Sequence, residues 1–253
     1  MPETETTNIS TSGDVVAGKV SISDFLWADR FFWIAVFLCL SLQAYPGTRW
    51  LLWPLKQFGV YVHELFHGLS SYVFGGSFGS MTMFPDGGGF ATTTYYSSVG
   101  IAFVSAGGLL GPAILGGIIL FFSRRFRLSN YLLKGLAVLF MLSAMLWASD
   151  WYTAGLGLGI AVVLGAVSFF PYKGIVRVFT QYLGVQLCLE NLLDFDYMFT
   201  ESFQRDGVEI MSDTAGIAAA LGGSYFMWAC IIAFLTLVIV VFSVIKSRPM
   251  IHE

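Results

Sequence analysis

Long apolar segments separated by short polar ones make up most of the chain. About 20 apolar residues in a helix cross a bilayer, and a tilted or partly shielded segment can depart from that length. The sixth such segment holds polar side chains and is expected to face the bundle interior or to be re-entrant, so six or seven membrane helices are expected. The segments cover residues 31–45, 50–73, 99–122, 131–147, 153–170, 172–193 and 215–245, with a polar loop at 194–213.

A glycine-rich stretch, Gly75–Tyr96, differs from everything around it. Two β-prone runs flank the turn signal Pro85-Asp86-Gly87, which predicts a β-hairpin. Bare strands are not viable in lipid, so protein must shield this hairpin or it must line a wet cavity. It would offer an edge on which an extended peptide could pair. An ordinary connection between two helices is the alternative.

Composition supports a membrane protein. Of 253 residues, 56% are hydrophobic and 11% charged, whereas soluble domains carry about 25% charged residues. The fold class expected is an all-α polytopic membrane protein with one short β-hairpin after the second helix. Residues 1–22, rich in Thr, Ser, Glu and Gly, are expected to be a disordered tail, residues 23–248 a single transmembrane domain, and residues 249–253 a C-terminal tail.

Charge gives an orientation and excludes one class of function. The net charge of −3 comes without a basic patch, so nucleic-acid binding has no support. Basic residues after the third, fifth and last segments belong on the cytoplasmic side by the positive-inside rule. Alternation of seven spans then puts the N-terminus outside and the start of the second segment inside. It places the hairpin and the loop at 194–213 together on the outer face.

The second segment contains a His-Glu-x-x-His motif, His63 to His67. On a helix these histidines lie on one face, one turn apart, and can bind a single zinc ion. Glu64 beside them can hold and deprotonate a water molecule that the metal binds. The alternative is a chance spacing of polar residues, but ionisable groups at membrane depth are costly and are candidates for function. The motif therefore predicts a Zn²⁺ site with Glu64 as general base.

A catalytic zinc ion takes three protein ligands and keeps one open position. The remaining histidine, His252, is in the C-terminal tail, so a carboxylate is expected as the third ligand. Asp213, at the start of the last segment, is the first choice and Asp194 the runner-up. As an alternative, Asp213 is a helix N-cap in competition with Ser212. The other candidates are Glu190, Asp196, Glu201, Asp206 and Glu209.

Together these features resemble the site-2 protease family of intramembrane zinc metallopeptidases, with the compact B-like branch as the closer match. The resemblance runs from Trp50 to about Gly223. Ser212-Asp213-Thr214-Ala215 looks like the Ser-Asp-Ala element of that branch, and Leu193-Asp194-Phe195 like its preceding Leu-Asp element. The resemblance implies that both histidines of the motif bind zinc, that the glutamate is the general base, and that an aspartate before a later span is the third ligand.

Two functions follow from these residues. The first is an intramembrane zinc metalloprotease that hydrolyses a peptide bond in or near a transmembrane segment, as in regulated intramembrane proteolysis. The second is a non-proteolytic metal-binding membrane protein, either a transporter or an inactive protease-like scaffold. The halves show no inverted repeat, which disfavours transport, and an intact Glu64 disfavours an inactive relative. The expected partners are a membrane-protein or peptide substrate and the lipid bilayer of a plasma membrane or bacterial inner membrane; the sequence specifies no oligomeric state.

Overall fold

The computed structural model describes residues 30–45, 47, 49–123, 125–193, 195–205 and 207–246. Both predicted tails, Asp194 and Asp206 therefore lie outside the described residues. The described chain is mostly helical, as predicted, because a helix satisfies its own backbone hydrogen bonds in an apolar surrounding. Its main helices are α2 (Arg30–Ala44), α3 (Arg49–Ser71), α4 (Ser98–Phe122), α5 (Phe126–Trp147), α6 (Trp151–Ser168), α7 (Lys173–Leu193), α9 (Asp213–Leu221) and α10 (Tyr225–Lys246).

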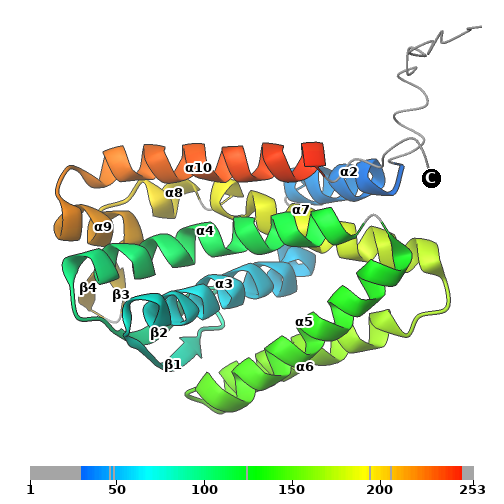
Figure 1. Cartoon of the computed structure of the whole chain (residues 1–253), viewed down its shortest axis with the longest axis horizontal. Coiled ribbons are helices and arrows are strands. Elements are labelled where there is room, and N and C mark those ends of the chain that lie inside the picture. The colour runs from blue at the N-terminus through cyan, green and yellow to red at the C-terminus, as the bar shows by residue number, and fades with distance from the viewer. Residues whose placement is uncertain are drawn as a thin grey trace, which may run out of the picture.

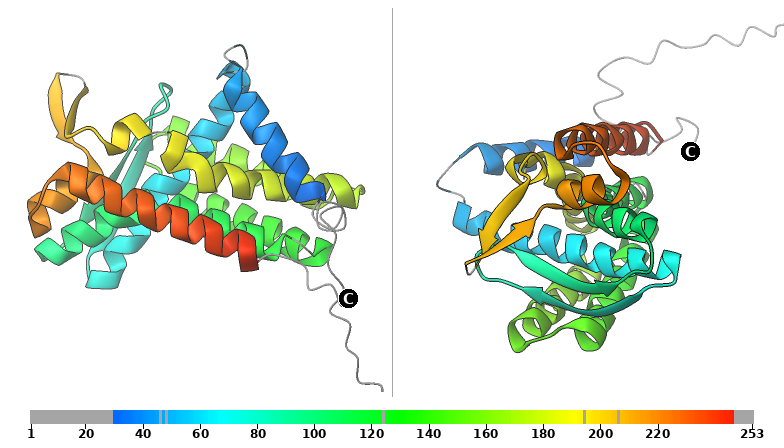
Figure 2. Two further views of the ribbon diagram at one scale, coloured as in Figure 1. Left: turned by 90° about the horizontal axis from the view of Figure 1, so that it is seen from above. Right: turned by 90° about the vertical axis from the view of Figure 1, so that its left-hand side faces the viewer.

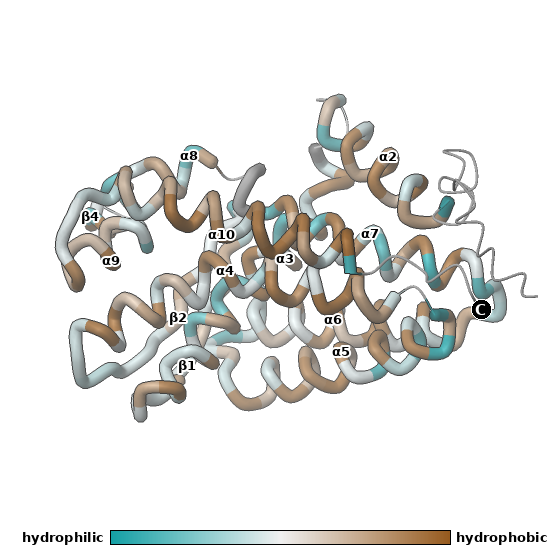
Figure 3. Tube along the Cα trace, turned by 45° about the horizontal axis from the view of Figure 1, so that its top comes forward, coloured by the Kyte–Doolittle hydropathy of each residue, from teal (hydrophilic) through white to brown (hydrophobic). Residues whose placement is uncertain are grey.

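Four of the described helices, α4, α5, α6 and α10, are long and apolar enough to cross a membrane. In Figure 3 apolar residues dominate α10, which has the highest mean hydropathy of the four. Helix α2 has 15 residues, so it is about 22 Å long, short of a hydrocarbon core of about 30 Å. Helices α3 and α7 carry more polar residues than the four candidate spans.

The helices surround α3, which holds the metal motif (Figure 1). Helix α4 packs along α3, α5 and α6 form an antiparallel pair on one side, and α10 and α2 lie on the other (Figures 1 and 2). Gly107 and Gly111 of α4 lie against α3: an added Cβ would overlap Ser70 at the first and Phe66 at the second. Small residues on α4 thus let the two backbones approach.

The predicted hairpin is confirmed, with β1 (Ser77–Met83) antiparallel to β2 (Gly89–Thr94). Protein covers the outer edge of β1: the N–H of Ser149 donates to the carbonyl of Met81 at 3.0 Å, and the N–H of Met83 donates to Thr153 Oγ1 at 2.8 Å. Among the described residues no strand pairs with the other edge of β2. The edge of β1 is therefore covered by protein, and the outer edge of β2 has no described strand beside it.

The predicted polar loop at 194–213 instead contains regular structure. The short helix α8 (Phe195–Met198) is followed by a second hairpin, β3 (Ser202–Arg205) with β4 (Val208–Met211). Gly207 has a φ of 78° in its turn, a conformation that glycine adopts without strain. The sequence did not predict this hairpin because its strands are only four residues long.

The last predicted span, 215–245, is two helices rather than one. Helix α9 ends at Leu221, and α10 begins at Tyr225 after Gly222 and Gly223, whose φ angles are 86° and 87°. Two successive residues in that region break a helix. The break turns the chain, so that the first turn of α9 faces α3 while α10 runs along the outside of the bundle (Figure 2).

The expected alternation of the first two spans stays a prediction, and the contacts of α2 and α3 are as follows. Helix α2 begins beside the start of α7, where the Arg177 guanidinium lies 4.7 Å from the centre of the Phe31 ring. The first half of α3 lies against the turn of the first hairpin, where Trp53 Nε1–H donates to the carbonyl of Pro85 at 2.9 Å and Gln57 Nε2–H to that of Phe84 at 2.7 Å.

Candidate metal centre and active-site cavity

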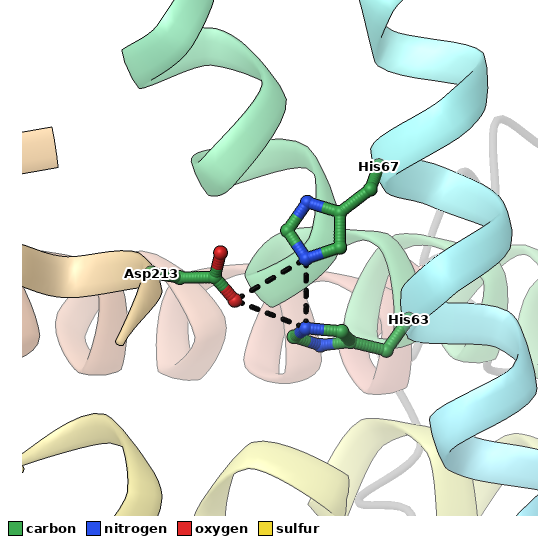
Figure 4. Close-up of side chains that lie close together, drawn as sticks. All are labelled: His63, His67 and Asp213. Carbon is green, nitrogen blue, oxygen red and sulfur yellow. Dashed lines mark hydrogen bonds and ion pairs between the residues drawn. The ribbon is translucent and has the colours of Figure 1, made fainter. Parts of the chain in front are cut away.

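The two histidines of the motif converge with Asp213 (Figure 4). His63 Nε2 and His67 Nε2 lie 2.9 Å apart, one turn from each other on α3. Oδ2 of Asp213 lies 3.0 Å from the first of these nitrogens and 3.2 Å from the second. Three ligand-type atoms thus form a small triangle, although His63 and Asp213 are 150 residues apart in sequence.

Local structure directs the Asp213 carboxylate into this triangle. Ser212 is the N-cap of α9, and its Oγ accepts the N–H of Ala215 at 3.3 Å. Asp213 is therefore the first helical residue rather than the cap, which removes the capping alternative. Thr214 Oγ1–H donates to the carbonyl of Met198 at 2.9 Å and ties the start of α9 to α8.

The ring of His67 is oriented by α4. Its Nδ1 lies 2.8 Å from the carbonyl oxygen of Val104, which only accepts, so Nδ1 carries a proton and Nε2 is the nitrogen that faces the triangle. Gly108 leaves the space that this ring occupies, because a Cβ there would overlap the imidazole. A hydrogen bond from the second nitrogen to a carbonyl is typical of metal-binding histidines.

Glu64, the glutamate of the motif, lies beside the first hairpin. It is buried, with 6% of its surface exposed. A Cβ added at Gly89, the first residue of β2, would lie 2.6 Å from Glu64 Cγ, so the strand passes directly beside the carboxylate. The backbone of β2 and the carboxylate of Glu64 therefore border the same space.

That space is a cavity of about 210 Å³, with room for several water molecules. Its wall is formed by residues of both hairpins and of the helices α3, α4, α7 and α8. Its lining residues are Lys56, Val60, His63, Glu64, Gly87, Gly88, Gly89, Leu109, Glu190, Tyr197, Met198, Phe203 and Arg205.

The donor set fits a zinc ion. Zinc binds imidazole nitrogens at about 2.0–2.1 Å and carboxylate oxygens at about 2.0–2.2 Å, which puts ligand atoms about 3.3 Å apart in a tetrahedron. The observed separations of 2.9, 3.0 and 3.2 Å need only a few tenths of an ångström of expansion. Two neutral imidazoles and one carboxylate also match the ligands of catalytic zinc sites.

A family model described as Peptidase M50B-like matches residues 31–243. The chain belongs to this family. The resemblance to the site-2 protease family is thereby confirmed, and the chain is a membrane protein of a metallopeptidase family. Comparison with curated proteins and with solved structures gave no match.

Among the other predicted carboxylates of this M50B-like chain, Glu190 also lies at the cavity. Its carboxylate packs against Gly59, one turn before His63 on α3, and Gln186 Nε2–H donates to it at 3.4 Å. Asp196, Glu201 and Glu209 are not in the cavity wall. The remaining candidates, Asp194 and Asp206, lie outside the described residues.

Sequence reasoning missed two residues of the M50B-like site. Tyr197, on α8, donates its hydroxyl proton to Asp213 Oδ2 at 3.0 Å. Arg205, on β3, forms an ion pair with Asp86 in the turn of the first hairpin at 2.6 Å. Neither belongs to a motif, because each acts through a contact between segments far apart in sequence.

The ion pair changes the acidity of Asp86. Partial burial alone would raise the pKa of this carboxyl, but the N–H of Gly88 and the guanidinium of Arg205 outweigh burial and lower the pKa below its ordinary value of 3.8. The carboxylate stays charged at neutral pH, so it holds the two hairpin turns together. The predicted shared face of the first hairpin and the segment at 194–213 agrees with this contact.

Proposed function

We propose that this protein is an intramembrane zinc metalloprotease that hydrolyses a peptide bond in or near a transmembrane segment. The observation that carries the proposal is the convergence of His63, His67 and Asp213 next to a cavity that His63 and Glu64 line. Membership of a peptidase family and four helices able to cross a membrane support it. The finer features we propose are a single domain over residues 23–248 and a location in a plasma membrane or bacterial inner membrane.

Each side chain has a chemical task in this proposal. His63, His67 and Asp213 would hold zinc, which supplies a Lewis acid and lowers the pKa of water. Glu64 takes a proton from the attacking water and returns it to the leaving amine nitrogen, as general base and then general acid. Its burial at the cavity wall keeps bulk water away from this proton transfer.

The first hairpin would orient the substrate. β2 is an edge without a second strand among the described residues, and Gly89 at its start touches Glu64. An extended peptide added along β2 would bring its carbonyl groups past that carboxylate. A transmembrane helix must unwind locally to pair in this way, because a helix has no free backbone groups for strand addition.

The test compares membranes of cells that produce the wild-type protein with membranes of cells that produce Glu64→Gln. Mass spectrometry of protein N-termini should find new termini, in or near transmembrane segments, only with the wild type. If zinc binds and the two sets of termini are identical, the protein is a non-proteolytic metal-binding protein. If wild-type protein binds no zinc, the metalloprotease proposal fails altogether.

A further inference from the structure

A tyrosine outside the metal motif contacts the ligand triangle. The hydroxyl of Tyr197 donates to Oδ2 of Asp213 at 3.0 Å, and this is the same oxygen that faces His63 Nε2 and His67 Nε2. A phenol carries one donor proton, so this contact uses its full donor capacity. The hydroxyl therefore reaches the carboxylate at the atom that faces the histidines.

Packing keeps the ring of Tyr197 in this place. The ring packs in a T-shaped arrangement with the ring of His63, with centroids 6.1 Å apart and an interplanar angle of 80°. The ring of Tyr197 also packs against the ring of Phe203 in β3, with ring centroids 5.7 Å apart. The neighbouring residue, Met198, accepts a hydrogen bond from Thr214 in α9. The ring is thus held between α3, the second hairpin and the helix that carries Asp213.

We propose that Tyr197 is a positioning residue that orients the Asp213 carboxylate as a metal ligand. The proposal rests on the proposed zinc site. Asp213 comes from a different helix than the two histidines, and its carboxylate can rotate about its terminal torsion. A fixed donor on Oδ2 restricts this rotation, so less freedom is lost when a metal binds. Carboxylates that bind metals are typically held by such hydrogen bonds.

The experiment measures the zinc dissociation constant of purified full-length protein by competition with a chelator. Tyr197→Phe keeps the ring and removes only the hydroxyl, so zinc binding should weaken by about 10–100-fold. Tyr182→Phe is the matched control, because its buried hydroxyl has no hydrogen-bond partner among the described residues. The control should bind zinc as the wild type does.

A second measurement separates positioning from a general structural role. If Tyr197 acts through Asp213, Tyr197→Phe should have no further effect on zinc affinity in the Asp213→Ala background. The melting temperature of the metal-free Tyr197→Phe protein should stay within about 4 °C of the wild type, since packing is preserved.

Three results would overturn the proposal: wild-type zinc affinity in Tyr197→Phe, an equal loss in both backgrounds, or a larger fall in the metal-free melting temperature. These failures leave the zinc site itself intact, provided that the wild type binds zinc. A wild-type protein that binds no zinc refutes the proposed function and this inference together.

Discussion

The guanidinium of Arg205 lies 2.6 Å from the carboxylate of Asp86 and joins the turns of two hairpins that are 119 residues apart. The guanidinium carbon also lies 3.8 Å from the centre of the Phe84 ring. Both hairpins line the cavity that contains His63 and Glu64. The pair therefore closes one side of the proposed active site.

Loss of this ion pair should loosen the hairpins more than it destabilises the fold. Asp86 is 68% exposed, so the pair contributes about 0–1 kcal/mol. We expect Arg205→Ala to increase amide hydrogen exchange at residues 84–88 and to leave the melting temperature nearly unchanged. Glu209→Gln is the control, since that side chain bonds Ser202 within its own hairpin. Equal rates of amide hydrogen exchange at residues 84–88 in Arg205→Ala and Glu209→Gln would show that the ion pair does not hold the hairpins together.

The same pair should respond to acid. The folded pKa of Asp86 is below its ordinary value of 3.8, so its contribution is fully present above that value and is lost as the pH falls through the lower folded pKa. Hydrogen exchange at residues 84–88 should therefore rise below a pH of about 4 in the wild type. Arg205→Ala should show a smaller rise.

Zinc should be present at about one ion per chain in protein purified without chelator. His63→Ala and His67→Ala each remove one of the imidazoles and should lose most of the metal, as measured by elemental mass spectrometry. Wild-type protein without a transition metal, even after zinc is resupplied, would contradict the proposed site.

Glu64→Gln separates catalysis from metal binding. The amide has nearly the same size as the carboxylate but cannot accept the proton of water, so cleavage should stop while zinc content stays at the wild-type level. Cleavage of a membrane substrate at the wild-type rate would mean that another group is the base.

Asp213→Ala should affect zinc binding, whereas Ser212→Ala should affect stability alone. Removal of the Asp213 carboxylate should weaken zinc binding well beyond the roughly 10–100-fold expected when only a supporting residue is lost. Ser212→Ala removes the cap of α9 and should cost about 1 kcal/mol of stability while zinc stays bound. Asp194→Ala tests the runner-up. If it shows the larger metal defect, Asp213 is not the third ligand.

Gly108→Ala should disturb the metal centre through packing alone. A Cβ at this position overlaps the His67 imidazole, so the ring must move away from Val104 and zinc affinity should fall. Gly135→Ala on α5 is the control, because its Cβ would meet no atom within 4 Å. Alanine there should stabilise the helix by about 0.5–1 kcal/mol. Unchanged zinc affinity in both variants would contradict the packing argument.

Several features of this protein could be predicted because they depend on neighbours along the chain. Helical spacing alone puts His63 and His67 on one face, and the apolar runs predicted at 99–122 and 131–147 form the helices Ser98–Phe122 and Phe126–Trp147. The turn signal at Pro85-Asp86-Gly87 located the first hairpin. The position of Asp213 before the last apolar segment makes it a candidate for the third ligand.

Other predictions failed where local pattern and tertiary contacts differ. The final apolar run is continuous in hydropathy, yet Gly222 and Gly223 adopt positive φ angles and divide it into α9 and α10. The second hairpin is built from strands of four residues, which leave almost no periodic signal.

The sequence by itself determined the helical membrane fold, the paired histidines and the adjacent glutamate, because these depend on hydrophobicity and helical period. Only the tertiary structure decided which carboxylate meets the histidines, that Ser212 rather than Asp213 caps α9, and that Tyr197 and Arg205 border the cavity. The reason is physical. Contacts between residues 63 and 213 depend on how whole helices pack, and helix packing is set by the summed shape of many side chains rather than by any short motif.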